Sequence, residues 1–293
     1  MANPIVTVSG TCGNGRELAQ FYDLGVLGAF TAKSTTLEKR LGNPTPRIAE
    51  CSSGILNSIG IPSEGVRHFI KDDLPFLRQY RVPVIVSIAA TRADDYPQIA
   101  SILDQEEGIS AIEVNISCPN LESGGCSFGS DPKVAGYIIQ SVKKNTKFPV
   151  IAKLTPNVSD ISIIARTVEK AGADAISMIN TLAGMAIDIQ TWRPKLGNVV
   201  GGLSGPAIKP VAIKMVWEVY RAVHIPILGM GGIMTWEDAI EFILAGATAV
   251  GVGTALLRDP WVVFDILRGI SDYLESRGIE RLSDLRGKVV LPK

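Results

Sequence analysis

The chain has 293 residues, of which 46% are hydrophobic and 20% are charged. This composition excludes a disordered or low-complexity protein, because such chains cannot bury enough apolar surface to offset the entropy lost on ordering. Lysine and arginine together number 29, as do aspartate and glutamate, so the net charge is zero and there is no basic excess of the kind typical of nucleic-acid-binding proteins.

The cysteine content and the N-terminal residues indicate where the protein works. The four cysteines, Cys12, Cys51, Cys118 and Cys126, contain no C-x-x-C pair and are too sparse for a disulfide scaffold. The chain starts without the basic and apolar regions of a signal peptide, and no apolar run approaches the roughly 18 residues of a membrane helix. We therefore expect a reduced, cytoplasmic protein that binds neither membranes nor nucleic acid.

Short apolar runs recur along the chain and alternate with segments of helical periodicity. Runs of this kind, in which polar and apolar residues do not alternate, are typical of strands buried on both faces of a parallel sheet. Eight strands are expected, at residues 28–32, 83–88, 111–116, 149–154, 173–179, 199–202, 226–230 and 247–252. Helices are expected between them, including residues 132–144, 161–171, 206–223 and 236–245.

Eight strands alternating with helices favour a closed (β/α)8 TIM barrel over an open doubly wound sheet. No G-x-G-x-x-G motif follows an early strand, which weakens the open-sheet alternative further. We expect one domain over residues 1–293, with an N-terminal strand or hairpin and with an insertion at residues 48–80 between the first two barrel strands.

Polar and glycine residues collect at the C-terminal ends of the expected strands, where barrel enzymes place their chemistry. Glycines follow the seventh and eighth strands, at residues 229–232 and 251–253. Because glycine allows backbone N–H groups to approach a phosphate closely, these loops predict a phosphate site; tight turns are the alternative.

Three other kinds of residue at these ends suggest a reactive site. Lys33 and Lys153 could pair with a carboxylate, a phosphate or the electron-rich edge of a flavin, could form a Schiff base, or could be solvated surface lysines. Cys118 could act as a base or nucleophile, or be a small buried hydrophobe. Asparagine amides would match the alternating N–H and C=O groups of a pyrimidine-dione, or serve in turns and caps; the candidates are Asn57, Asn115, Asn120 and Asn180.

Taken together, several motifs resemble the dihydroorotate dehydrogenase family. They are residues 8–15 (VSGTCGNG), 33–36 (KSTT), 42–47 (GNPTPR), 57–60 (NSIG), 114–120 (VNISCPN), 153–157 (KLTPN), 201–210 (GGLSGPAIKP), 229–233 (GMGGI) and 251–254 (GVGT). The cysteine of NISCPN and the stretch 185–210 resemble class 1B, and we expect no membrane-associating extension of the class 2 kind. The resemblance runs from about residue 8 to about residue 254.

The resemblance implies FMN-dependent oxidation of (S)-dihydroorotate to orotate in de novo pyrimidine biosynthesis. Cys118 would remove the C5 proton while a hydride passes from C6 to N5 of FMN. The implied substrate contacts are Lys33, Asn57, Ile59, Gly60, Ile61, Asn115, Asn120, Asn180 and Thr181. Lys153 would lie at the N1/O2 edge of the flavin, and the other implied FMN contacts are Ser9, Gly10, Lys33, Ser34, Asn115, Ile179, Gly205, Gly231, Gly232, Gly253 and Thr254.

The resemblance also implies a partner subunit that carries FAD and a [2Fe-2S] cluster and passes electrons to NAD+. Two catalytic and two accessory chains would assemble around a homodimer. The few, unclustered cysteines agree that an iron–sulfur cluster would belong to another chain, and no metal site is expected in this one.

Several alternatives stay open at this point. A dihydropyrimidine dehydrogenase-like subunit would act on uracil or thymine, and another class 1 enzyme would use fumarate or a different acceptor. A Schiff-base aldolase or synthase would use Lys153, and an inactive flavin-binding subunit would have only a structural role. Cys126 is either an uninvolved neighbour of Cys118 or its partner in a disulfide formed on oxidation.

Overall fold

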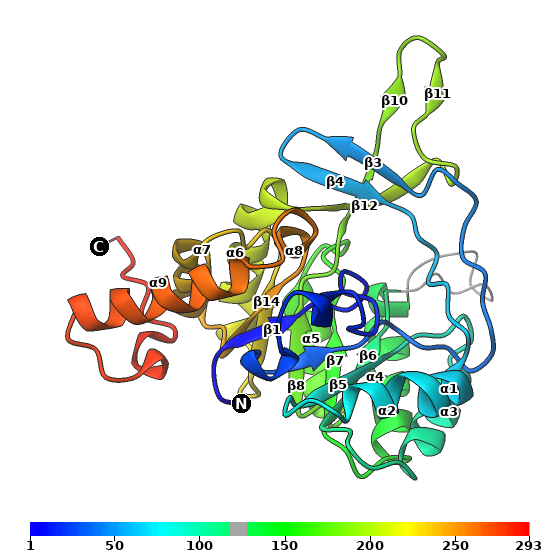
Figure 1. The fold of residues 1–293 in the computed structure, drawn as a ribbon, viewed down its shortest axis with the longest axis horizontal. Helices are drawn as coiled ribbons and strands as arrows, with labels where there is room; N and C mark the ends of the chain where they lie inside the picture. Colours follow the sequence, from blue (N-terminus) through cyan, green and yellow to red (C-terminus); the bar gives the residue numbers. More distant parts are fainter. Residues whose placement is uncertain (118–127, 293) are drawn as a thin grey trace.

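A closed barrel of eight parallel strands forms the body of the protein, which is represented by a computed structural model describing residues 1–117 and 128–292. The sheet order is β1-β14-β13-β8-β7-β6-β5-β2. A parallel bridge between Val6 and Ala29 brings β1 back against the chain leading into β2 and closes the barrel (Figure 1). The strands are β1 (Ile5–Thr7), β2 (Phe30–Thr31), β5 (Val84–Ile88), β6 (Ala111–Asn115), β7 (Val150–Lys153), β8 (Ala175–Met178), β13 (Ile227–Met230) and β14 (Ala249–Val252).

Helices surround the barrel, as the alternating sequence pattern predicts (Figure 1). The longer ones are α3 (Asp95–Leu103), α4 (Pro132–Lys143), α5 (Ile161–Lys170), α6 (Lys209–Tyr220), α7 (Trp236–Ala245) and α9 (Val262–Ser276). Their starts are set by local sequence: Asp131 accepts two backbone N–H bonds ahead of Pro132, and Thr235 and Asp238 form a capping box. The short helices are α1 (Val66–His68), α2 (Leu74–Leu77) and α8 (Thr254–Arg258).

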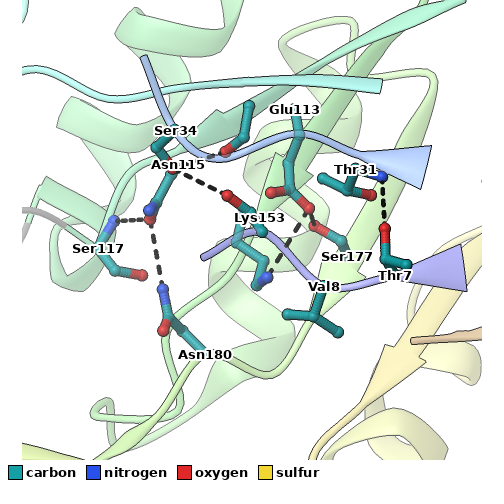
Figure 2. Close-up of polar contacts among 12 residues, drawn as sticks. Thr7, Val8, Thr31, Ser34, Glu113, Asn115, Ser117, Lys153, Ser177 and Asn180 are labelled. Atoms are coloured by element: carbon teal, nitrogen blue, oxygen red, sulfur yellow. Dashed lines mark hydrogen bonds and ion pairs between the residues drawn. The ribbon is translucent and has the colours of Figure 1, made fainter. Parts of the chain in front are cut away.

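The barrel strands bury both faces, which explains their continuous apolar runs. One face packs against the helices in the main core. The other face lines the barrel, where Val6, Ile85, Ile151 and Leu228 belong to a small apolar cluster. Further along β6, β7 and β8, at the C-terminal ends of the strands, the lining becomes polar (Figure 2).

A separate antiparallel sheet has the order β3-β4-β12-β9 (Figure 1). Its strands are β3 (Ile48–Cys51), β4 (Gly54–Asn57), β12 (Val200–Ser204) and β9 (Leu182–Met185). A hairpin of β10 (Ile187–Asp188) and β11 (Arg193–Pro194) extends away from the barrel beyond this sheet (Figure 1). The insertion expected at residues 48–80 is confirmed, because β3, β4, α1 and α2 all lie between β2 and β5.

The barrel fold is confirmed, but the position predicted for one of its strands is wrong. Residues 199–202 belong largely to β12 in the antiparallel sheet, and β1 takes the place in the barrel that was assigned to them. Burial explains the difference, since β1 is fully buried whereas β12 is partly exposed and contains two glycines. Of the expected N-terminal strand or hairpin, the structure has the strand, which pairs with β14 as part of the barrel.

Within the two described ranges, no helix combines the length and the apolar character needed to cross a membrane.

Candidate functional site

A buried ion pair lies inside the barrel near the C-terminal ends of β6 and β7. The Nζ atom of Lys153 is 3.8 Å from Oε2 of Glu113, and the Ser177 hydroxyl donates a 2.7 Å hydrogen bond to the same oxygen (Figure 2). Lys153 is 4% exposed, Glu113 is 1% exposed and Ser177 is fully buried. A buried charge is costly unless it is paired, so Glu113 is what allows an ammonium group to be held inside the barrel.

Two of the predicted asparagines meet directly at the same end of the barrel. The Asn180 amide donates to Oδ1 of Asn115 over 3.3 Å, and the backbone N–H of Ser117 donates to that oxygen over 3.2 Å (Figure 2). The Tyr96 hydroxyl donates to the Asn115 carbonyl over 2.8 Å, and Oδ1 of Asn180 accepts from the Thr181 N–H. These contacts fix the orientation of both amides.

The loops after β1 and β2 are joined by hydroxyl groups. The Ser34 hydroxyl is 3.2 Å from that of Ser9 and 2.8 Å from that of Ser87, which lines the barrel on β5. The neighbouring Lys33 is half-buried, and its backbone N–H donates to the carbonyl of Gly13. Burial, and then the charge of Arg47, lower the pKa of the Lys33 ammonium group.

A cavity of about 370 Å³ adjoins this region, and its lining includes Lys33, Ser34, Ser63, Glu64 and Asp73. The charged and hydroxyl groups in its mixed lining could bind a charged or hydrogen-bonding ligand. A second, open groove of about 540 Å³ lies between α5 and α6 and contains none of the predicted site residues.

The antiparallel sheet brings Asn57 and Thr181 close together. Asn57 pairs with Gly202 across β4 and β12, and its amide donates to the Gly202 carbonyl over 3.2 Å. A Cβ atom on Gly202 would lie 2.0 Å from Oγ1 of Thr181, so only glycine fits between them. Asn157 adds support, because its amide donates to the Thr181 carbonyl and accepts from Ala183.

The loop that follows β4 is tied to the segment before β3. Arg40 donates to the Gly60 carbonyl over 2.7 Å, and the Asn43 N–H donates to the Ile59 carbonyl. Gly60 has φ +78°, and a Cβ there would lie 2.4 Å from the Asn43 nitrogen. Ile61 also has a positive φ, of 50°, which is uncommon for a branched residue. The backbone of residues 59–61 is thus held in one specific shape.

Glycines from three loops converge into a corner beside the start of α8. A Cβ on Gly232 would lie 2.7 Å from the Gly205 carbonyl, and one on Gly231 would lie 2.9 Å from Cβ of Ala212 and 3.3 Å from Ile179. Thr254, the first residue of α8, donates to the Ser204 hydroxyl over 3.1 Å. Gly253 caps α8, and Gly205 precedes the turn that leads into α6. Crowded glycines, a hydroxyl and two helix starts together suit a phosphate group.

The barrel interior also holds polar atoms that lack a partner within the described part of the chain. They are Oε1 of Glu113, Oγ1 of Thr31 and the Ser117 hydroxyl. Buried polar atoms are nearly always hydrogen-bonded, so these atoms are available to bind a polar ligand or water. Gly10, with φ +91°, faces open space on the same side of the barrel. A phosphorylated cofactor with a polar ring therefore fits the residues present.

Three predicted or discussed residues, Cys118, Asn120 and Cys126, lie outside the described residues. Conversely, sequence reasoning gave no site role to Glu113, Ser177 or Ser87, and it quoted Asn157 and Ser204 only as parts of motifs. One signal was available for Glu113, because it is the single charged residue in an apolar strand and shares the inward face of β6 with Asn115.

These features are those of a cofactor-dependent (β/α)8-barrel enzyme. A model of the dihydroorotate dehydrogenase family matches residues 1–274. The chain belongs to the dihydroorotate dehydrogenase family, which consists of flavin-dependent oxidoreductases.

Curated relatives are similar over nearly the whole chain. A protein from Desulforamulus reducens is 54% identical over 287 residues, which cover 98% of this chain and 94% of the relative. Proteins from Alkaliphilus oremlandii and from Geobacter sp. M21 are 52% and 50% identical, and each match covers 99% of this chain and 95% of the relative. All three carry the name dihydroorotate dehydrogenase B (NAD(+)), catalytic subunit. That name implies a second subunit in those enzymes.

Proposed function

We propose that the chain catalyses the FMN-dependent oxidation of (S)-dihydroorotate to orotate in de novo pyrimidine biosynthesis. The observation that carries this proposal is the identity of about half of all positions with curated dihydroorotate dehydrogenase B catalytic subunits over 98–99% of the chain. The paired amides of Asn115 and Asn180, which lie beside a buried lysine, support it.

The proposed substrate site uses the amides for the ring and cationic or backbone groups for the carboxylate. Asn115 and Asn180 present donors and acceptors that complement the N–H and C=O groups of a dihydropyrimidine-dione. Asn57 and Thr181 would complete the ring contacts from the antiparallel sheet, together with Asn120. The carboxylate would be bound by Lys33 and by the backbone of residues 59–61.

The proposed FMN site divides into a phosphate end and a ring end. Gly205, Gly231, Gly232 and Thr254, with Gly253, would hold the phosphate. The ring would be contacted by Ser9, Gly10, Lys33, Ser34, Asn115 and Ile179. FMN, when bound, supplies the acceptor for the hydride. Lys153 would place its positive charge at the N1/O2 edge of the ring, and Glu113 would keep that ammonium group oriented.

Cys118 is the proposed base. Removing the C5 proton, together with the loss of a hydride from C6, leaves the C5–C6 double bond of orotate, so two electrons and two hydrogens are accounted for. A partner subunit that carries FAD and a [2Fe-2S] cluster would take up the two electrons removed from the substrate and pass them to NAD+. Two catalytic and two accessory chains would assemble around a homodimer in the cytoplasm.

An anaerobic half-reaction tests the proposal. The purified chain, reconstituted with FMN, is mixed with dihydroorotate without oxygen while the visible flavin absorbance is followed. Bleaching is expected, and Cys118→Ser should slow it at least about 100-fold and shift its pH dependence. Cys51→Ser serves as the matched control, because Cys51 is a half-buried free thiol on β3, and it should bleach at the wild-type rate.

Two results would contradict the proposal. A yellow protein that stays oxidised with dihydroorotate but bleaches with dihydrouracil would instead support a dihydropyrimidine dehydrogenase-like function. A protein that takes up no FMN would overturn the flavin assignment.

A further inference from the structure

Aromatic side chains from two distant segments meet where the loop after β1 contacts the start of α9, and exposed apolar residues flank them along the chain. We call this group the aromatic patch: Phe21 and Tyr22 from the loop after β1, Leu257 from α8, and Trp261 and Phe264 from the start of α9. Leu257, Trp261 and Phe21 are about half exposed, at 56%, 50% and 48%. Large apolar side chains that group together on a surface mark an interaction site more often than single ones do.

Ring contacts hold the patch together. Tyr22 lies edge-on to Phe264 with ring centres 5.2 Å apart, and it is 5.8 Å from Trp261. Trp261 and Phe264 are 5.7 Å apart. Tyr22 is buried beneath the other two rings, and its hydroxyl has no partner among the described residues. The surface is therefore preformed, which lowers the entropic cost of binding a partner.

The aromatic patch is continuous with the proposed cofactor site through two separate segments. The chain runs from Ser9 and Gly10 through Thr11 and Cys12 to Phe21 and Tyr22. The second segment is α8, which begins at Thr254 in the glycine corner and contains Leu257. Thr11 itself lies against Gly253, since a Cβ on that glycine would be 3.4 Å from the Thr11 side chain. The first segment thus ends in the ring cluster at Tyr22, and the second leads along the chain through Leu257 to Trp261.

We propose that the aromatic patch is the docking surface for the electron-transfer subunit, an inference that rests on the function proposed above. Electron transfer weakens steeply with distance, so a redox partner must bind close to the flavin, whereas a second copy of this chain has no such requirement. The names of the relatives imply an additional subunit. Aromatic anchors within a polar rim are typical of protein interfaces, and Asp23, Arg258 and Asp259 supply exposed charges next to the patch residues along the chain.

The hairpin of β10 and β11 is the competing surface. Trp192 is 88% exposed and Ile189 is 78% exposed, but the hairpin extends away from the barrel (Figure 1). Trp192 therefore offers a matched control, because it is an exposed tryptophan remote from the glycine corner.

The test separates flavin reduction from partner binding. Wild type, Leu257→Glu, Trp261→Glu and Trp192→Glu are each assayed alone with dihydroorotate and a small diffusible dye as acceptor. They are then assayed with NAD+ and a purified FAD- and iron–sulfur-containing subunit that supports NAD+ reduction by the wild-type chain. Affinity for this subunit is measured by titration. We expect Leu257→Glu and Trp261→Glu to weaken binding at least about 30-fold, the loss typical of an interface hot spot. Dye reduction should stay within about twofold of wild type, and Trp192→Glu should bind normally.

Other outcomes would overturn the docking assignment. Normal subunit binding by both patch variants would do so, as would loss of binding by Trp192→Glu alone. If Leu257→Glu instead converts a dimer of the isolated chain into monomers and leaves subunit binding intact, the patch contacts a second copy. Hydrogen exchange of the wild-type complex tests the same surface without any variant that might misfold. Amides of residues 20–22 and 257–264 must become protected when the subunit binds. Failure of the wild type to reduce the dye would contradict the proposed function and not the docking surface.

Discussion

Replacing Glu113 with glutamine should destabilise the barrel far more than the same change on the surface. Glu113→Gln keeps the shape of the side chain but leaves the Lys153 ammonium group buried without a counter-charge. At the observed separation of 3.8 Å, the attraction is about 4 kcal/mol for an effective dielectric constant of 20. Breaking a buried pair from one side typically costs about 3–5 kcal/mol, so the melting temperature should fall by about 10 °C.

The assay is equilibrium unfolding in urea of the flavin-free protein, so that stabilisation by bound cofactor does not enter. Glu218→Gln is the control, because Glu218 pairs with Lys214 over 2.8 Å on the exposed face of α6 and should change stability by less than about 1 kcal/mol. The double variant Glu113→Gln/Lys153→Met should be at least about 2 kcal/mol more stable than the sum of the two single-variant losses in unfolding free energy would give. Equal effects of Glu113→Gln and Glu218→Gln would refute the reasoning.

Three further predictions concern titration, the glycine corner and the substrate carboxylate. Burial raises the pKa of the Cys12 thiol from 9.0 to about 11, so the unfolded chain loses this proton first. Wild type should therefore lose up to about 3 kcal/mol between pH 9 and 11 relative to Cys12→Ala, and parallel curves of unfolding free energy against pH would contradict this. Gly232→Ala should weaken FMN binding at least about 10-fold, because its Cβ would meet the Gly205 carbonyl. The control is Gly278→Ala, at a glycine with φ +63° and open space around it, and this variant should bind FMN normally. Equal FMN affinities of the two variants in a fluorescence titration would argue against a phosphate site at the glycine corner. Lys33→Met should weaken orotate binding by about 10- to 100-fold but leave uracil binding unchanged in flavin difference spectra. Because the pKa of Lys33 is lowered, wild-type orotate affinity should decline at a lower alkaline pH than for an ordinary lysine, and a flat profile would exclude Lys33 as the carboxylate contact.

Buried strands proved easier to predict than exposed ones. The runs that form β5, β6 and β7 are continuous apolar stretches because both of their faces are covered. Residues 199–202 are also mostly apolar or glycine, and composition alone does not reveal that β12 pairs antiparallel with β4 and β9. The three-residue strand β1 is fully buried, but its sequence is too short to be distinguished from a strand outside the barrel. The division of the chain into a single domain stays a prediction.

Site residues that lie at the ends of strands could be predicted from the sequence. Those whose role depends on a partner on another strand could not. Asn115, Lys153 and Asn180 follow from their places at the ends of apolar runs. The role of Ser87, which bonds Ser34 across neighbouring elements, depends on three-dimensional closure and leaves no local pattern. Glu113 could be recognised only from the alternation of side chains along β6, which places it on the same face as Asn115. That alternation can be used only once the bounds of the strand are known.

The join between β1 and β2 has a consequence for how the protein holds its cofactor. The other neighbouring barrel strands share at least two register pairs, whereas this join has a single bridge, Val6 to Ala29. Its hydrogen bonds run from the Thr7 N–H to the Ala29 carbonyl, from the Gly28 N–H to the Ile5 carbonyl, and from the Thr31 N–H to the Thr7 hydroxyl. Ser9 and Ser34 lie on either side of it. Under the proposed assignments both serines contact the flavin, so the bound cofactor would bridge the two sides of the β1–β2 join and stabilise it. Loss of the cofactor should then loosen the first 35 residues before the remaining strands separate, and the N-terminal segment becomes the natural reporter of cofactor content.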